Sequence, residues 1–390
     1  ELINLIHINF LLNLKMLNLL FKKIINNYKI FTSINLIIKK KPRFIFYSEN
    51  KSYQKYTYLL IKLISKKYPG EVYYVSSDID DKILDNNIIN IFIGSSFLRV
   101  YFFNFIKTEN IFLTLTDLGN HFIKKSKNVK RYIYYFHSPI STTKSYTQGA
   151  FDNYDLILCN GEYQYNEIRK RESHTNTNMK QLLKTGYFYF DYLAQKIQNN
   201  VIPDEILIAP SWNYGAKNFV NMNFENIIEV LLKKNFIVRF RPHPELFKRS
   251  KTTLEKIKKK FINAKFIFDE DVDNCDSMQK AKCLITDNSG IAIEYLLLFK
   301  KPVLYFEDLD KIHNKNYKDF SDFTTIEDNL KVDFGKTFTL NDLDVLDVLI
   351  NSSISEFKNK EQGINYFIKN NFYNFSQVVN KSDTIMNKIF

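Results

Sequence analysis

The sequence has few of the residues that cross-link small secreted domains, because only three of its 390 residues are cysteines. Cys159, Cys275 and Cys283 form neither an even set nor a Cys-x-x-Cys pair, which excludes a disulfide framework. Cys159 and Cys283 lie in apolar runs, where a free thiol behaves as a small hydrophobic side chain. We therefore expect reduced, buried thiols and a cytoplasmic protein.

Long uncharged apolar runs are absent as well. Residues 1–31 carry hydrophobic residues near helical spacing, but Lys15, Lys22 and Lys23 interrupt them, and no run reaches the roughly 18–20 residues that cross a bilayer. No small-residue cleavage site follows, so we expect neither a spanning helix nor a signal peptide. Two interpretations of this amphipathic helix stay open: it packs on the first domain, or it lies on an anionic membrane surface.

Glycine is also scarce, and none of the ten glycines belongs to a Walker loop or a Gly-rich dinucleotide turn. Ligands at metal spacing are lacking too, because His7, His174 and His313 each stand without a second ligand nearby. We therefore expect no metal ion and no cofactor.

Basic residues are in excess, with 55 Lys and Arg against 42 Asp and Glu and a formal net charge of +13. This balance favours phosphate-bearing substrates, anionic lipid surfaces or other polyanions as partners. The lysine-rich run at residues 248–260 has helical spacing, which is typical of a solvated helix face. We expect no nucleic-acid partner.

Short apolar runs rich in β-branched and aromatic residues alternate with helical segments, a pattern typical of parallel sheets with crossover helices. The pattern restarts after Pro203, which indicates two α/β domains. We expect, in chain order, an amphipathic helix, an acceptor-side Rossmann-like domain, a nucleotide-binding Rossmann-like domain and a helix that crosses back, at residues 1–31, 32–198, 199–370 and 371–390. The predicted strands are residues 43–47, 72–75, 89–93, 111–116, 132–136, 156–159, 206–209, 236–240, 265–268, 283–286 and 303–306.

Two such domains in series place a cleft between the carboxyl ends of their strands, where doubly wound sheets bind ligands. One motif at a strand end is Phe-Arg-Pro-His-Pro-Glu at residues 240–245. Pro242 and Pro244 end the strand ladder and hold His243 in an extended loop. An imidazole there, beside Arg241, suits a phosphate group, and the alternative is a loop histidine without a role.

A second motif, Thr-Asp-Asn-Ser-Gly, joins a predicted strand to a predicted helix at residues 290–299. A helix that begins at a strand end presents unpaired backbone N–H groups to an anion, although helix capping alone explains the motif equally well. Glu294, on the same helix, is expected to reach a ribose or sugar hydroxyl. The phosphate-binding candidates are Thr286, Asp287, Asn288, Ser289 and Gly290.

A third motif places His137 and Ser138 directly after the predicted strand at residues 132–136. We expect one histidine from each domain to have a separate role. His137 would take a proton from an acceptor hydroxyl, and His243 would stabilise phosphate charge. A plain buried histidine is the alternative for His137. Further candidates for the acceptor side follow the preceding strand and are Asp117, Asn120 and His121.

Taken in chain order, these motifs resemble the signature series of the CDP-glycerol glycerophosphotransferase family, whose members make teichoic-acid-like and capsular polymers. The resemblance covers residues 132–307. His137-Ser138-Pro139 stands where the family has His-Gly-Thr-Pro, and Gly186-Tyr187 matches its Gly-Tyr-Pro turn. The other matching segments are Ile206–Trp212, Arg241–Pro244 and Leu284–Phe306.

The resemblance implies a GT-B-like fold, in which two Rossmann-type doubly wound domains face a central cleft. The residue patterns add an N-terminal amphipathic helix and a helical C-terminal tail. The resemblance also implies no catalytic metal, a general base at His137, and donor-phosphate contacts from His243 and Ser289. Arg241 and Ser211 are expected on the same donor side. Ser138 replaces a motif glycine, Asn-Ser-Gly replaces Tyr-Ser-Ser after Asp287, and Glu294 stands where Asp is usual, which leaves the donor's polyol open.

We therefore predict a transferase that moves a glycerol-phosphate or related polyol-phosphate unit from a CDP-linked donor to a hydroxyl of a cell-surface glycan or lipid-linked acceptor, releasing CMP. A GT-B glycosyltransferase that uses a nucleotide sugar in surface polysaccharide synthesis is the alternative. A basic membrane- or nucleic-acid-binding protein without catalysis is a third hypothesis. Lipid-linked acceptors, common in the family, favour peripheral attachment to the inner face of the cell membrane.

Overall fold

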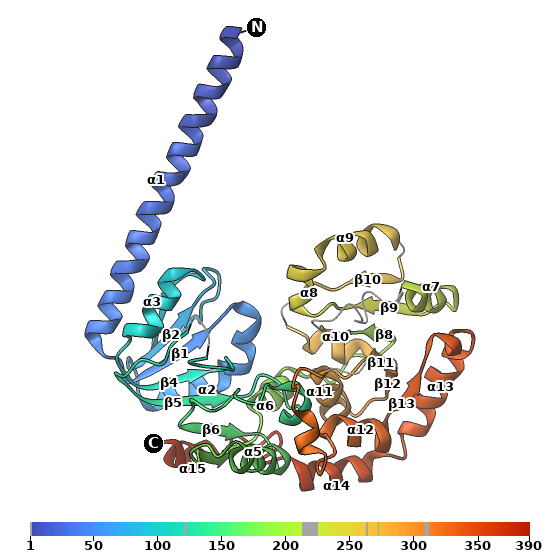
Figure 1. Ribbon diagram of the computed structural model, residues 1–390. Helices are drawn as coiled ribbons and strands as arrows, with labels where there is room; N and C mark the ends of the chain where they lie inside the picture. Colours follow the sequence, from blue (N-terminus) through green and yellow to red (C-terminus); the bar gives the residue numbers. More distant parts are fainter. Residues whose placement is uncertain (1, 121–122, 213–224, 263, 272, 308–311) are drawn as a thin grey trace.

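The computed structural model describes residues 2–120, 123–212, 225–262, 264–271, 273–307 and 312–390. Two parallel β-sheets form its two halves, each flanked by helices, and a long helix projects from the first half (Figure 1). The predicted fold class, with two doubly wound α/β domains, is confirmed.

The first sheet has seven parallel strands in the order β3-β2-β1-β4-β5-β6-β7. In β1, Phe44 and Phe46 belong to one hydrophobic core, whereas Ile45 and Tyr47 belong to the core on the other face. Because both faces are buried, the strand reads as a continuous apolar run, which is the signal that sequence analysis detects. The strands are β1 (Phe44–Ser48), β2 (Val72–Ser76), β3 (Ile88–Phe92), β4 (Thr108–Leu113), β5 (Val129–Tyr135), β6 (Leu156–Cys159) and β7 (Gln181–Lys184).

The second sheet has six parallel strands in the order β10-β9-β8-β11-β12-β13. Two strands, β7 and β13, were not predicted from the sequence. Both lie at sheet edges and leave residues partly exposed, so they lack the continuous apolar run of an inner strand. The strands of this sheet are β8 (Glu205–Ile208), β9 (Ile237–Phe240), β10 (Phe266–Phe268), β11 (Ala281–Thr286), β12 (Val303–Phe306) and β13 (Lys336–Phe338).

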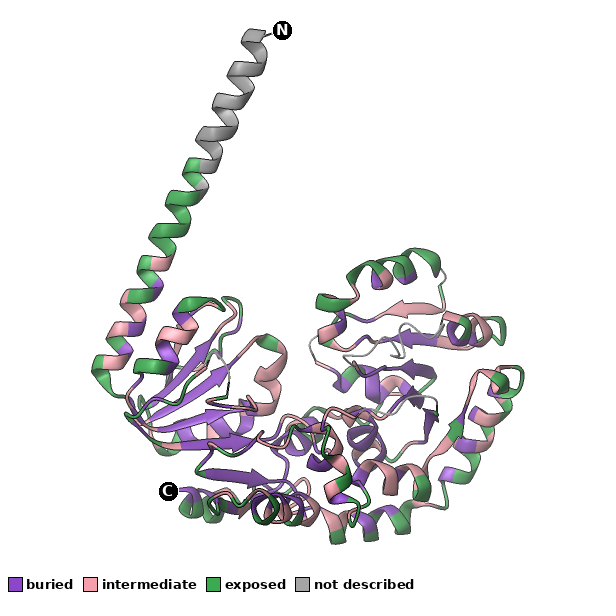
Figure 2. Cartoon of the chain, viewed as in Figure 1, coloured by how far each residue is buried: buried purple, intermediate pink, exposed green. Residues whose placement is uncertain are grey.

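Helices connect the strands and cover both sheets (Figure 2). In the first half they are α2 (Gln54–Lys67), α3 (Phe97–Phe105), α4 (Thr142–Ser145), α5 (Glu162–Thr175) and α6 (Phe188–Lys196). In the second half they are α7 (Glu225–Lys233), α8 (Pro244–Arg249), α9 (Lys251–Lys260), α10 (Cys275–Lys280), α11 (Gly290–Phe299) and α12 (Ile326–Phe334).

The first helix, α1 (Leu2–Lys40), continues beyond the predicted end at residue 31, and its last turns pack on the first domain. Ile30, Ile34 and Ile37 are buried there, at spacings that place them on one face. Before Ile30 the helix points away from the rest of the chain (Figures 1 and 2). Within the described residues, no helix combines the length and the apolar character needed to cross a membrane.

The chain after β13 is helical and returns to the first domain. α13 (Leu346–Phe357) and α14 (Glu361–Asn371) follow the second domain, whereas α15 (Ser382–Ile389) lies against the first sheet. The ring of Phe390 lies 4.8 Å from that of Phe44, and Arg131 Nη1 donates a hydrogen bond of 2.7 Å to the carbonyl oxygen of Ile389.

The three cysteines are free and buried, as the sequence predicts. Burial raises the pKa of the Cys275 thiol to about 11 and the pKa values of the other two thiols still further. All three are therefore structural apolar groups at neutral pH.

Gly186 generates a prediction about the returning tail. Its φ is +93°, and an added Cβ would collide with the carbonyl oxygen of Tyr373. We expect Gly186→Ala to lower the free energy of unfolding by more than about 2 kcal/mol, because it combines backbone strain with a clash. Gly70→Ala is the matched control, since its φ is +76° and nothing lies within 4 Å of an added Cβ. Equal losses in denaturant titration would contradict the proposed crowding at Tyr373.

Candidate active site

The candidate site lies at the carboxyl ends of the strands in both sheets. In the second sheet, β8 and β11 are neighbours, and the chain leaves them toward opposite edges, which makes their ends a topological switch point. Ser211 follows β8, and residues 287–290 follow β11. In the first sheet His137 follows β5, so each domain contributes a loop from the same kind of edge.

The two domains touch directly at this place. An added Cβ on Gly290 would collide with the Ser138 hydroxyl and would lie 3.5 Å from Ile140 Cγ2. Ser138 therefore lies against the first residue of α11, and the His137 motif and the 286–290 motif meet, although they belong to different domains.

His137 is half-buried in an aromatic environment. The rings of Tyr53 and Tyr56 lie 5.3 and 6.0 Å from its imidazole, both in edge-on orientations. Its carbonyl oxygen accepts a hydrogen bond of 3.1 Å from the Tyr187 hydroxyl. The peptide and the ring of His137 are thus held from different sides, as a positioned proton acceptor requires.

Ser289 is the N-cap residue of α11, yet its side chain makes no capping hydrogen bond. Its backbone is extended, with φ −108° and ψ 144°, and its own N–H donates to the Asp287 carbonyl at 2.7 Å. The Ser289 hydroxyl and the first N–H groups of α11 together form an arrangement suited to an anion.

Hydrogen bonds of buried side chains connect the loop after β8 to the end of β11. The residues involved are Thr286, Asp287 and Ser211. The Asp287 carboxylate accepts hydrogen bonds from the Ser211 backbone N–H at 2.8 Å and from the Ser211 hydroxyl at 2.6 Å. The Thr286 hydroxyl donates to the Ala209 carbonyl at 2.6 Å. Their polar atoms therefore join the ends of β8 and β11, and Asn288 beside them is half-buried.

Arg241 extends from the end of β9 and is oriented by a buried carboxylate. Its Nη1 lies 2.9 Å from Asp269 Oδ2, and its Nη2 donates to the Asp271 carbonyl at 2.6 Å. Burial raises the pKa of Asp269, but Arg241 and the Ser277 hydroxyl more than compensate, and the pKa is lowered. The guanidinium is thus pre-positioned, with part of its donor capacity already used.

His243 is the N-cap residue of α8, and its Nδ1 accepts a hydrogen bond of 3.2 Å from the Glu245 backbone N–H. An Nδ1 that accepts leaves the proton of a neutral imidazole on Nε2, so His243 is set to donate from Nε2. The Trp212 ring lies 6.2 Å from His243 and 5.6 Å from His313, and the Arg249 guanidinium lies 4.9 Å from the Trp212 centroid.

Glu294 lies one turn after Gly290 on α11 and is buried. Tyr187 donates to its Oε1 at 2.9 Å, and Asn274 Nδ2 donates to its Oε2 at 3.4 Å. Burial raises the pKa of Glu294 to about 7, with opposing effects from Lys55 and these hydrogen bonds. Both carboxylate oxygens are thus engaged by protein groups, and the expected contact with a ribose or sugar hydroxyl stays a prediction.

Lys55 of α2 was not predicted as a site residue. It lies in the first domain and acts on the charge of Glu294. Its Nζ lies 5.2 and 5.4 Å from the ring centroids of Tyr56 and Tyr189. Burial lowers the pKa of Lys55 to about 8, and the charge of Arg241 acts in the same direction, whereas Glu294 opposes it. No sequence signal separates this lysine from the many others of the chain.

The remaining acceptor-side candidates contact a different segment. Asp117, with φ +58°, accepts a hydrogen bond of 2.5 Å from the Thr147 hydroxyl. The Asn120 side chain lies near Gly149, since an added Cβ there would be 3.3 Å from Asn120 Nδ2. His121 lies outside the described residues. Asp117 and Asn120 thus pack on the turn at residues 147–149, after the His137 loop.

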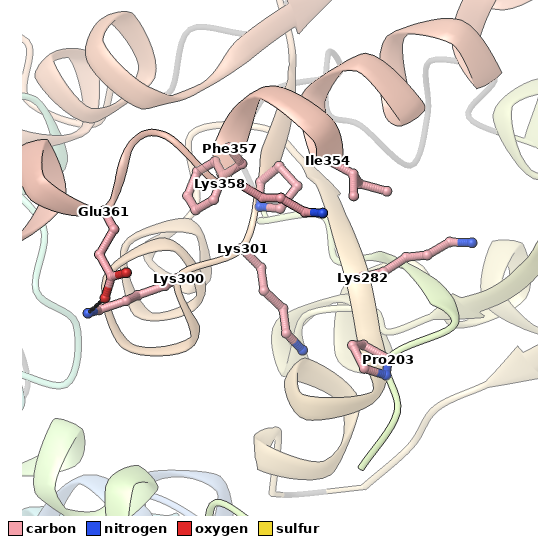
Figure 3. A pocket seen from close by; sticks show the side chains of 9 residues that line it. Pro203, Lys282, Lys300, Lys301, Ile354, Phe357, Lys358 and Glu361 are labelled. Atoms are coloured by element: carbon pink, nitrogen blue, oxygen red, sulfur yellow. Dashed lines mark hydrogen bonds and ion pairs between the residues drawn. The ribbon is translucent and has the colours of Figure 1, made fainter. Parts of the chain in front are cut away.

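A separate cavity of about 370 Å³ lies at the opposite edge of the second sheet (Figure 3). It is formed where β8, β11 and β12 begin, and therefore does not belong to the candidate site. The residues that line this cavity are Pro203, Lys282, Lys300, Lys301, Pro302, Ile354, Phe357, Lys358 and Glu361.

Within the described part of the chain, no group of three or more His, Cys, Asp or Glu side chains is arranged to hold a metal ion.

The contact between Gly290 and Ser138 yields a prediction. We expect Gly290→Val to lower the free energy of unfolding by about 1–3 kcal/mol, because the added side chain overfills the contact between the domains. Adding Ser138→Gly to the same chain should restore most of the loss, since it removes the colliding hydroxyl. Denaturant titration of the single and double variants tests this. Additive losses would show that the two residues do not share one space.

Comparisons with known proteins identify the family of the chain. Residues 125–371 match the model of the family described as CDP-glycerol:poly(glycerophosphate) glycerophosphotransferase. The chain is 26% identical over 302 residues to the minor teichoic acid biosynthesis protein GgaB of Bacillus subtilis (strain 168). That match covers 73% of this chain but 30% of GgaB, so the chain spans less than a third of that relative.

Solved structures show the same fold. The wall teichoic acid polymerase TagF matches with a TM-score of 0.59 and 16% identity, over 94% of this chain and 95% of that chain. A TagF variant soaked with CDPG matches with a TM-score of 0.56 and 15% identity, over 95% and 97% of the two chains. The GT-B-like architecture predicted from the sequence is confirmed.

Proposed function

The chain belongs to the CDP-glycerol:poly(glycerophosphate) glycerophosphotransferase family, and from this premise we propose that it transfers a glycerol-phosphate or related polyol-phosphate unit from a CDP-linked donor to a hydroxyl of a surface glycan or lipid-linked acceptor. The observation that carries the proposal is the contact of Ser138 with Gly290, because Ser138 directly follows His137 and lies against the first residue of α11. The TagF structure soaked with CDPG supports a CDP-linked donor.

In the proposed reaction, His137 takes the proton of the acceptor hydroxyl while the hydroxyl oxygen attacks the β-phosphorus of the donor. The bond from that phosphorus to the bridging oxygen breaks, and CMP leaves with the electron pair. The new phosphodiester joins the polyol phosphate to the acceptor. Proton removal by a positioned base contributes about 10²–10⁴-fold to such a step.

The donor phosphates would lie at the start of α11. The Ser289 hydroxyl and the first N–H groups of the helix donate to phosphate oxygens, and the Nε2–H of His243 adds a donor from the neighbouring loop. Arg241, held by Asp269, contributes positive charge. Stabilising charge that develops on phosphate oxygens is the main source of rate in phosphoryl transfer.

The chemistry predicts a large loss on replacing either histidine. His137→Ala and His243→Ala should each lower the rate of CMP release about 100-fold or more, because one removes the base and the other a phosphate donor. The assay follows CMP release from CDP-glycerol with a polyol-phosphate acceptor. His174→Ala is the control, since His174 is exposed and pairs with Asp319 at 3.1 Å. Full activity of His137→Ala would contradict the proposed base.

Calorimetric titration with CDP, UDP and GDP separates the alternatives. Cytidine-selective binding that is weakened in His243→Ala supports polyol-phosphate transfer. Selective binding of UDP or GDP would instead indicate a nucleotide-sugar glycosyltransferase that uses the same cleft. Absence of nucleotide binding, with salt-dependent binding to polyanions, would indicate a protein without catalysis.

The projecting part of α1 supports a second element of the proposal, attachment to an anionic membrane surface. α1 contains no acidic residue, and Lys22, Lys23 and Lys29 lie in its projecting part. Apolar side chains with lysines among them suit the interface of an anionic bilayer. Among the side chains that the structure describes there, the apolar ones that are more than half exposed are Leu17, Leu20, Phe21, Ile24, Ile25 and Tyr28.

We therefore expect the chain to sediment with vesicles that contain phosphatidylglycerol and to stay in the supernatant with phosphatidylcholine alone. Replacing Ile24 and Ile25 with Asp should abolish sedimentation, because each Asp removes apolar contact and adds repulsion. Val332→Asp with Val348→Asp is the matched control, since both valines are exposed on the second domain. Equal sedimentation of the two double variants, or a lipid-independent dimer through α1, would contradict membrane attachment.

A further inference from the structure

Tyr187 lies where the chain leaves the first domain, and its hydroxyl is shared between two acceptors. The oxygen is 3.1 Å from the carbonyl oxygen of His137 and 2.9 Å from Oε1 of Glu294. The first acceptor belongs to the loop of the proposed base, and the second to α11, the helix proposed to hold the donor phosphates. One buried phenol therefore bridges the acceptor side and the donor side.

A phenol has only one proton to donate. When Glu294 is ionised, its carboxylate is the stronger acceptor, and the Tyr187 hydroxyl donates its hydrogen bond to Glu294. The His137 carbonyl then loses its donor. When Glu294 is protonated, its own O–H can donate to the Tyr187 oxygen, and the phenolic proton turns to His137. The arrangement thus links the charge on α11 to the peptide that carries the base.

Charged groups from both domains affect the ionisation of Glu294, and so decide which acceptor receives the hydrogen bond of the Tyr187 hydroxyl. Lys55 of α2 and Arg241 after β9 face the carboxylate and favour its charged form, whereas burial favours its neutral form. Asn274 donates to its second oxygen, and the rings of Tyr56 and Tyr189 close the cluster. Asp273 adds negative charge near Lys55 and Tyr189.

Gly290 and Glu294 are four residues apart on α11 and so lie on one face of the helix. Gly290 contacts Ser138, and Glu294 reaches His137 through Tyr187. His137 and Ser138 are therefore connected to two consecutive turns of α11. Ser138 contacts Gly290 directly, and Tyr187 connects His137 to Glu294.

We propose that Tyr187 is a positioning residue that fixes the His137 peptide against α11 and so sets the distance from the proton acceptor to the donor phosphates. The inference rests on the proposed function and adds a residue to it. Tyr187 does not touch the reacting atoms in this proposal; it acts through His137 and Glu294.

Tyr187→Phe tests the proposal, because it removes the hydroxyl and keeps the ring that packs 5.1 Å from Phe190 and 5.9 Å from Tyr189. We expect kcat for CMP release to fall about 10-fold or more, because displacements near 1 Å are costly in oriented reactions. The KM for the donor and the affinity for CDP should change less than about 2-fold, since the phosphate contacts of α11 remain.

Tyr74→Phe is the matched control. Tyr74 is likewise buried, on β2 of the first sheet, and its hydroxyl donates to the buried Asp81 carboxylate at 2.9 Å and not to the His137 loop or Glu294. Its kcat should stay within about 2-fold of the unmodified chain. Melting temperatures of both variants show whether either loses its fold.

A double-mutant cycle adds a second readout. Tyr187→Phe and Glu294→Gln should be non-additive in kcat, because both act through the same hydroxyl. If the unmodified chain releases CMP and Tyr187→Phe equals Tyr74→Phe, the positioning role is overturned while the proposed function stands. If the unmodified chain releases no CMP, the proposed function and this inference are overturned together.

Discussion

The contact between α11 and the His137–Ser138 segment is the constraint on which the arrangement of the site depends. The helix begins with a residue that has no side chain, and the hydroxyl of Ser138 occupies the space that a side chain would need. A backbone packed this closely leaves no room for the domains to slide at this point. The closest approach of the Ser138 segment to the start of α11 is therefore limited by packing.

Buried hydrogen bonds hold the loop after His137 to both domains. The carboxylate of Glu167 accepts from the backbone N–H and the hydroxyl of Thr142, and Glu327 of α12 accepts from the Ser141 N–H at 3.2 Å. Ser141 in turn accepts from the Ile326 N–H at 2.8 Å. Burial raises the pKa values of Glu167 and Glu327 to about 7 and about 8. This loop is thus part of a polar network between the domains, which favours one defined position over many.

Much of the fold could be predicted because inner strands of parallel sheets are apolar on both faces, as in β1 and β11. The contact between the His137–Ser138 motif and the start of α11 could be predicted because carboxyl ends of parallel strands gather at one edge, whereas a place for His243 beside them stays a prediction. Lys55 and the hydroxyl of Tyr187 could not, because their importance depends on distances across the domain boundary that no spacing records. The burial of Glu294 was missed for the same reason, since its partner Tyr187 lies on the other domain.

The returning tail lies against the segment that leads out of the first domain. After Gly186 the chain leads through α6 toward the second domain, and it comes back at Tyr373, whose N–H donates to the Asn160 carbonyl at 2.9 Å. The two crossings lie side by side, because Gly186 has no room for a side chain beside Tyr373. The chain thus connects the two domains twice at one place, and the second connection is closed by contacts of the tail with the first domain.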